Sequence, residues 1–306
     1  MNRLKKIVFC ASILSLATAM QAFALVGIGV HYGMDYTLSM KNTAGLGDRV
    51  TFDNLNLDLG QGAGSVLAGD SIPAFVSRSD FKSKFAVGGK VYIDVIPFID
   101  ALELSGDFGL WEYKGVINYP SSLKPASSLN TSNFADTGNF NYTQEELTLQ
   151  NFGLGYMGLK NTPYAKLQLD LTVRKYIVRF PSLLKILNLY GGAGVSGIFA
   201  TPVLSNKLVQ DVINESAQGT KSINSLGTDV LGNSSIMQGV VKKIISGLTQ
   251  PTFGMHLDLG LMVKIPVIPI GVYIDGKYII PFSKLDPSVD IGGMGFVLNT
   301  GIALAF

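Results

Sequence analysis

Hydrophobic and polar residues alternate with a period of two along eight segments of the chain. This is the pattern of a β-strand whose two faces meet different surroundings. The segments cover residues 25–39, 84–95, 102–110, 164–180, 187–199, 253–265, 270–280 and 290–306. All are longer than the ~5–6 residues usual in soluble sheets and suit the ~9–11 residues that a tilted strand needs to cross a bilayer. The pattern therefore predicts an all-β fold, an antiparallel transmembrane β-barrel of about eight strands.

The connections between these segments are of two kinds. Three strand pairs are each joined by a tight apolar turn that contains proline, at residues 84–110, 167–198 and 253–280. The other connections are long, at residues 40–82, 118–145, 200–250 and 283–289. Outer-membrane barrels have short turns on the periplasmic side and long loops outside. We therefore expect the three turns and both termini to be periplasmic and the long connections to be extracellular.

Two further segments leave the number of strands open. Residues 146–160 and 50–59 also alternate, the first with a slip of phase. Each segment is either the extension of a hairpin beyond the membrane or an additional crossing. Additional crossings would raise the number of strands to ten or more.

The connection at residues 200–250 has a helical period instead. Pro202 and Gly247 lie near its ends as start and stop signals. We expect a helical insertion of two amphipathic helices joined by a linker rich in Ser, Gly and Asn, with apolar stripes that something must cover. The helices could plug or cap the barrel mouth, lie on the outer leaflet or meet a partner. The apolar residues at helical spacing are Leu204, Leu208, Val212, Ile213, Met237, Val240, Val241, Ile244, Ile245 and Leu248.

Aromatic residues gather where the strands should leave the hydrocarbon, as in the two aromatic belts of a membrane barrel. On the turn side they are Phe98, Phe180 and Phe306. On the loop side they are Tyr36, Trp111, Tyr113, Tyr164, Phe199, Phe253 and Phe282. A slip of the alternation near Trp111 also predicts a β-bulge at the membrane edge.

The end of the last strand carries a resemblance to a known class. Phe306 is the terminal residue, and Leu304 and Ile302 stand two and four positions before it. This arrangement resembles the assembly signal of Gram-negative outer-membrane β-barrels. The resemblance implies a small barrel in the outer membrane, in contact with its lipid and inserted by the barrel-assembly machinery.

The N-terminus predicts export. Basic residues Arg3, Lys5 and Lys6 precede an apolar run and an Ala-Phe-Ala site, the pattern of a signal peptide cleaved after Ala24. This leaves residues 25–306 as the barrel domain. Cleavage removes three basic residues and no acidic one from a chain of net charge +2, which leaves about −1 and gives no support to nucleic-acid binding. The single cysteine, Cys10, lies in the signal, so disulfides and thiolate sites are excluded from the mature chain.

The inner face of the predicted barrel carries charges of both signs on nearly every strand. They form either a polar conduit or a set of side chains that fill a narrow barrel and neutralise one another, and eight strands favour the second. We expect the lumen-facing polar residues to be His31, Asp35, Lys84, Lys90, Asp94, Glu103, Asp107, Lys166, Asp170, Arg174, His256, Asp258, Lys264, Asp275 and Lys277.

The sequence offers little for catalysis or metal binding. His31 with Asp35, and His256 with Asp258, would suit a metal or an acid–base pair, but the predicted strands place the two pairs far apart. The match to G-x-G-x-x-G at residues 192–197 lies inside an alternating strand, so we discard it as a dinucleotide site. We expect no enzyme, no metal and no cofactor.

Four functions remain to be separated. The interpretation we favour is passive transport, a pore for small solutes, apolar ones included. The alternative is a closed structural or adhesive surface barrel, and less favoured is an outer-membrane enzyme. The fourth possibility is a secreted β-sandwich, which would stay soluble without detergent. The fold does not choose among the barrel functions.

Overall fold

A computed structural model describes the chain from Val26 to Ala305 with gaps. The described residues are 26–38, 49–51, 53–60, 65–66, 71–72, 74–79, 81–94, 99–130, 132, 136–147, 159–181, 186–216, 218–225, 234–247, 251–265, 268–286 and 291–305. The predicted signal peptide, residues 1–24, and Phe306 lie outside them.

Eight antiparallel strands form a closed barrel, as the alternation predicted. The strands are β1 (Val26–Asp35), β7 (Lys82–Ile93), β8 (Ala101–Tyr113), β11 (Thr162–Phe180), β12 (Leu187–Ala200), β14 (Thr252–Lys264), β15 (Ile270–Pro281) and β16 (Gly295–Ala305). Around the wall the order is β1-β16-β15-β14-β12-β11-β8-β7. The predicted last strand closes the sheet, because β16 pairs with both β15 and β1.

The outer surface of the barrel is apolar. Among the described residues, every strongly exposed large hydrophobic side chain lies on a barrel strand, in a turn between two of them or beside a strand end. In β1, for example, exposed Ile28, Val30 and Tyr32 alternate with residues that face inward. Because exposed apolar area of this extent is unfavourable in water, the surface is that of a transmembrane barrel. No helix in the described part of the chain is long and apolar enough to span a membrane.

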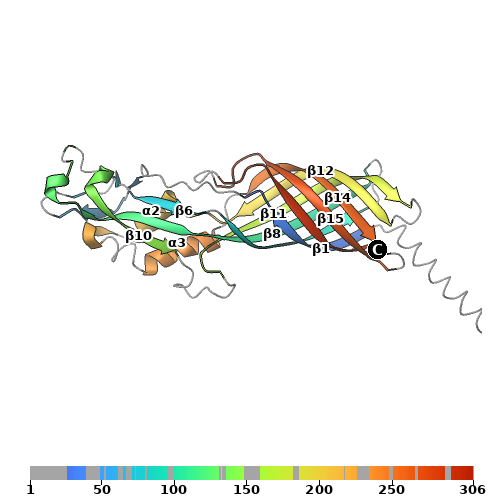
Figure 1. Ribbon diagram of the computed structural model, residues 1–306, viewed down its shortest axis with the longest axis horizontal. Helices are drawn as coiled ribbons and strands as arrows, with labels where there is room; N and C mark the ends of the chain where they lie inside the picture. The colour runs from blue at the N-terminus through green and yellow to red at the C-terminus, as the bar shows by residue number, and fades with distance from the viewer. Residues whose placement is uncertain are drawn as a thin grey trace, which may run out of the picture.

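The long connections fold into a second unit at one end of the barrel, which we call the head. Figure 1 shows the head at one end of the molecule's long axis, with the C-terminus at the opposite end of the barrel. Its strands form the sheets β10-β9-β6, β13-β3-β4 and β2-β5. They are β2 (Val50–Thr51), β3 (Leu55–Asp58), β4 (Ser65–Val66), β5 (Ser71–Ile72), β6 (Phe75–Arg78), β9 (Gly115–Leu123), β10 (Phe140–Leu147) and β13 (Gly219–Ser222). Its helices are α2 (Asn206–Ser216), α3 (Ser234–Ser246) and the short 3-10 helices η1 (Ala126–Ser128), η2 (Thr137–Asn139) and η5 (Ile223–Ser225).

In their described parts, the two doubtful segments do not cross the membrane. β10 ends at Leu147 and pairs with β9 in the head, so it extends a hairpin beyond the barrel. Residues 148–158 of the doubtful segment lie outside the described part of the chain. The segment at residues 50–59 supplies β2 and β3 of the head. The barrel therefore keeps eight strands.

The predicted helical insertion is present as α2 and α3, and its apolar stripes cover each other and the head sheets. Val212, Val240 and Ile244 are buried in one apolar cluster. The same cluster includes strand residues of the head such as Leu55 and Ile117. The helices therefore belong to the core of the head, because this core is what buries their stripes.

A bulge is present beside Trp111, as predicted, but the neighbouring strand carries it. β8 pairs with β11 without a shift from Ala101 to Tyr113, and the shift lies across from it in β7, between Ser83 and Phe85. The alternation slips in the sequence because the inside of the barrel changes from polar to apolar at the head. Trp111 and Tyr113 follow Asp107 and Gly109 on the inward face, but they meet the head's core.

The same change of surroundings corrects the predicted loop-side belt. Trp111, Tyr113 and Tyr164 are buried where the barrel meets the head, so they do not face lipid. Tyr36, Phe253 and Phe282 are exposed, as a belt requires. Sequence position alone placed both groups of aromatic residues at the membrane edge. They differ because the head covers the first group and leaves the second exposed.

Candidate functional site: the barrel lumen and its mouth

The lumen contains most of the polar residues that the sequence placed on the inner face. Asp35, Asp94 and Asp107 are partly covered, and Lys84 is exposed near the mouth and bonds Glu112 at 2.6 Å. The buried ones are His31, Lys90, Glu103, Lys166, Asp170, Arg174, His256, Asp258, Lys264, Asp275 and Lys277. Their contacts join strands that are not neighbours in the wall, so these side chains reach across the interior.

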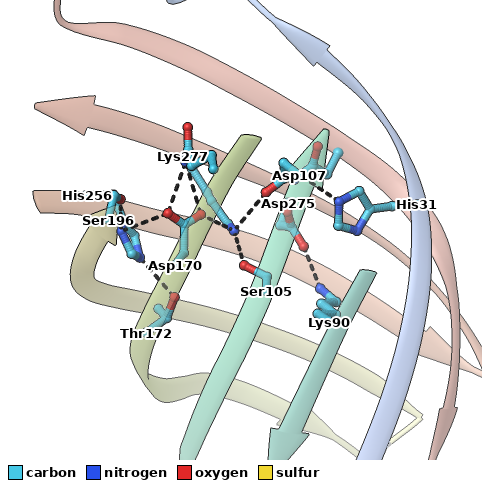
Figure 2. A network of polar contacts seen from close by, with 12 residues as sticks. His31, Lys90, Ser105, Asp107, Asp170, Thr172, Ser196, His256, Asp275 and Lys277 are labelled. Atoms are coloured by element: carbon cyan, nitrogen blue, oxygen red, sulfur yellow. Dashed lines mark hydrogen bonds and ion pairs between the residues drawn. The ribbon is translucent and has the colours of Figure 1, made fainter. Parts of the chain in front are cut away.

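Lys277 of β15 is the centre of one polar network (Figure 2). Its Nζ lies 2.7 Å from Asp170 Oδ2 and donates to Ser105 Oγ at 2.5 Å. Asp107 is a second carboxylate near it, with Oδ2 at 3.7 Å, and Asp107 Oδ1 lies 2.6 Å from His31 Nε2. A fully buried ammonium requires such compensation, because an unpaired charge in the interior is costly.

A second network lies beside the first and is centred on Arg174. Its guanidinium pairs with Glu103 and lies 3.5 Å from Asp258. Lys90 adds a 2.5 Å contact to Asp275 and lies 3.8 Å from Glu103. All five groups are at most a few per cent exposed. The middle of the barrel is thus filled by mutually neutralising charges, as the sequence favoured for eight strands.

Large tyrosine rings fill the space that inward-facing glycines leave. Tyr190 pairs across strands with Gly260, and a Cβ at Gly260 would overlap the Tyr190 ring. Tyr92 stands in the same relation to Gly27. With Tyr273, these tyrosines form a buried cluster that also contains Met262 and Ala303. The glycines of the alternating pattern therefore provide space for aromatic rings in the lumen.

The mouth on the head side is covered. Lys166 Nζ bonds Asp35 at 2.6 Å, and the apolar junction of barrel and head begins beyond this pair. Tyr113 Oη accepts a hydrogen bond from the Leu204 backbone N–H at 2.8 Å, and Arg78 donates to the Leu204 carbonyl at 2.7 Å. These bonds hold the segment before α2 against the end of β8.

One Ser/Thr–His–Asp group is assembled that the sequence could not bring together. His256 Nδ1 lies 2.8 Å from Ser196 Oγ, and its Nε2 lies 2.9 Å from Thr172 Oγ1. Asp170 is 3.8 Å from Nδ1 and is already bonded to Lys277. Both imidazole nitrogens contact hydroxyls, and Ser196 is 1 % exposed, so this group is part of the packed lumen.

The histidine pairs that the sequence proposed are not formed. His31 contacts Asp107 and Tyr273 in place of Asp35, and His256 contacts the two hydroxyls in place of Asp258. In the described part of the chain, no group of three His, Cys, Asp or Glu residues is placed to hold a metal ion.

The list of lumen residues predicted from the sequence left out the polar partners that carry no charge. Ser105, Thr172 and Ser196 all lie on the inner face by parity, so the alternation places them in the lumen. Their partners lie on strands far along the chain, 172 residues away for Ser105 and Lys277. The alternation along one strand shows which side chains face inward, but it does not show which residues of other strands they contact across the lumen.

Comparison with known proteins gives likenesses to solved structures and no family. No family model matches the chain, and no curated protein matches its sequence. One likeness is to the Neisserial surface protein A, at 8 % identity and TM-score 0.35, covering 92 % of this chain and 96 % of that one. Another is to the outer membrane protein OprG from Pseudomonas aeruginosa, at 10 % identity and TM-score 0.33, covering 92 % and 95 %. The barrel assignment rests on the strand pairing and the apolar exterior described above.

Proposed function

We propose that this chain is an outer-membrane protein whose closed barrel anchors the head at the cell surface, a structural or adhesive role without a catalytic step. The signal peptide would deliver it to the periplasm, and the barrel-assembly machinery would insert it in the outer-membrane lipid. The turns and termini would then be periplasmic and the head extracellular.

The filled lumen is the observation that carries this proposal. Arg174, Lys277 and Tyr190 are each at most 1 % exposed, and each lies in a cluster that spans the interior. The head's core continues from the barrel rim at Trp111 and Tyr164. Solute passage would require these groups to separate, and each separation would leave a buried charge unpaired.

The head has the properties of a domain exposed to water. Its large apolar side chains are covered, among the described residues, whereas those of the barrel face outward. The described part of the head therefore buries its apolar side chains without lipid or a partner. Such a unit on a membrane anchor suits display at the surface.

Transport of small solutes stays a prediction, and reconstitution tests it against the anchor. We expect the purified protein in planar bilayers to give no steady conductance above that of protein-free membranes. A general porin is the positive control. Stable single-channel steps, abolished by heat denaturation of the sample, would contradict the closed anchor and favour the pore.

Cysteine labelling tests the orientation separately. Ser127 of the head and Pro269 of a barrel turn are both exposed, and Cys10 is the chain's only cysteine. On intact cells a membrane-impermeant maleimide should label Ser127→Cys and spare Pro269→Cys, while lysed cells should label both. Labelling of Pro269→Cys alone on intact cells would invert the orientation.

A further inference from the structure

A small cavity in the lumen, on the side nearer the head, is lined by residues that carry buried oxygen atoms without hydrogen-bond partners. The cavity measures about 10 Å³, enough for one water molecule or one ion. Asp107, Gln168 and Asn299 line it together with Asp35 and Lys166. The cavity belongs to none of the tyrosine or arginine clusters described above.

Three of the lining residues each carry a buried oxygen without a hydrogen-bond partner among the described residues. The atoms are Asp107 Oδ2, Gln168 Oε1 and Asn299 Oδ1, and the first of them also lies 3.7 Å from Lys277 Nζ. Gln168 and Asn299 are at most 1 % exposed, so bulk water does not reach their side chains. Such acceptors are uncommon in folded proteins, and a bound water molecule or ion is one explanation for them.

The amide orientations follow from the neighbouring carboxylates. Gln168 Nε2 donates to Asp170 at 3.0 Å, and Asn299 Nδ2 donates to Asp107 Oδ1 at 3.2 Å. Each amide nitrogen therefore already faces a carboxylate, and the carbonyl oxygens are left for the cavity. Reversing either amide would place its oxygen against a carboxylate.

The wall leaves this space because the surrounding inner positions are small. Gly33 and Ala86 line the cavity on the neighbouring strands β1 and β7, whereas the Trp111 ring fills the space beside Gly109 of β8. A Cβ at Gly33 would stand 2.6 Å from Asn299 Oδ1. A methyl group here would therefore press on one of the three oxygens.

The net charge of the lumen favours a cation in this cavity. Between its two rims the ion-paired network holds six carboxylates and four permanent cations, an excess of two negative charges before the histidines are considered. The carboxylates are those of Asp35, Glu103, Asp107, Asp170, Asp258 and Asp275, and the cations are Lys90, Lys166, Arg174 and Lys277. An additional cation would reduce this excess.

We propose that the cavity binds one small hard cation through Asp107, Gln168 and Asn299. Carboxylate and amide oxygens are the ligands that such cations prefer, and the set contains no sulfur or imidazole ligand. Asp35 lies in the same lining, 2.6 Å from Lys166, and limits the repulsion between that lysine and the ion. The site adds a ligand to the closed barrel and does not depend on the anchoring role.

Equilibrium dialysis of the purified full-length protein in detergent tests this site. The protein is first treated with a chelator and exchanged into choline chloride, then dialysed separately against radioactive sodium and radioactive calcium. We expect one of the two ions to bind saturably at one per chain. Failure of both to bind would overturn the proposal and leave a water molecule as the occupant.

Variants locate the bound ion without relying on a single substitution. Asn299→Leu removes one oxygen and Gly33→Ala crowds it, so each should weaken binding by about tenfold or more, as loss of a supporting group does in other metal sites. The matched controls are Glu112→Gln at the mouth and Gly293→Ala, which has open space around its Cβ position. Unchanged affinity in both site variants, or equal loss in the controls, would overturn the assignment.

Discussion

Replacement of Lys277 by methionine removes the central cation of the lumen while keeping most of its volume. The ammonium is 0 % exposed and bonds Asp170, which is also 0 % exposed, and Asp107 lies 3.7 Å away. Lys277→Met therefore leaves two carboxylates without their shared cation. Removing one partner of a buried ion pair costs about 3–5 kcal/mol, because the other charge stays buried and unpaired.

The double variant separates pairing from simple loss of packing. Asp170→Asn alone leaves Lys277 with one fewer anion, so it should also destabilise the protein. In Lys277→Met/Asp170→Asn both charges are gone, and the total loss should be smaller than the sum of the single losses by about 1–3 kcal/mol. The matched control is Lys84→Met, whose partly exposed ammonium bonds Glu112 at the mouth and should cost about 1 kcal/mol or less.

Denaturant unfolding of the protein folded in lipid vesicles measures these differences. Trp111 is the only tryptophan and is buried at the junction of barrel and head, so its fluorescence reports the loss of that junction. Mobility of unheated samples on detergent gels reports the barrel itself. A loss below about 1 kcal/mol for Lys277→Met, or strict additivity in the double variant, would refute the view that the lumen is held by paired buried charges.

Three further predictions address the wall and its assembly. Deleting Phe306 should reduce the amount of folded protein in the outer membrane, measured by heat-modifiable mobility in membrane fractions, and normal insertion would count against the assembly signal. Leu171→Arg puts a charge on the lipid face near the middle of β11 and should destabilise the barrel in vesicles by about 2–4 kcal/mol, whereas Ser127→Arg on the head should change little. Gly260→Ala forces the Tyr190 ring to move and should cost about 1–3 kcal/mol in the same unfolding assay. Gly293→Ala is the control there, and equal stability of the two alanine variants would contradict the packing of tyrosine over glycine.

The barrel strands were predictable because the residues of each strand alternate according to what its own two faces contact. In β14, for example, Met255 and Leu257 face lipid while His256 and Asp258 face the lumen, and the alternation in the sequence states this directly. The helices α2 and α3 were predictable for the same reason, since a stripe at helical spacing is also local. The strand count stayed open because the segments at residues 50–59 and 146–160 have the same local pattern as a membrane crossing.

The sequence predicted which residues face the lumen, but it did not predict which of them contact one another. Parity placed Lys277, Asp170 and Asp107 on the inner face, but which carboxylate meets which cation depends on the stagger of strands on opposite sides of the barrel. The Ser196–His256 contact and the cavity at Gln168 and Asn299 depend on the same stagger. The alternation along a single strand carries no information about this stagger.

The sequence by itself determined that the chain makes strands with one lipid-facing side, how long they are and which residues face inward. It did so because the period of two is a property of each strand alone. Only the tertiary structure decided that there are eight crossings, that the long loops join into one head, and that Trp111, Tyr113 and Tyr164 are buried at its base. These outcomes depend on which strands pair and on what covers the mouth, and both are set by contacts between residues far apart in the chain.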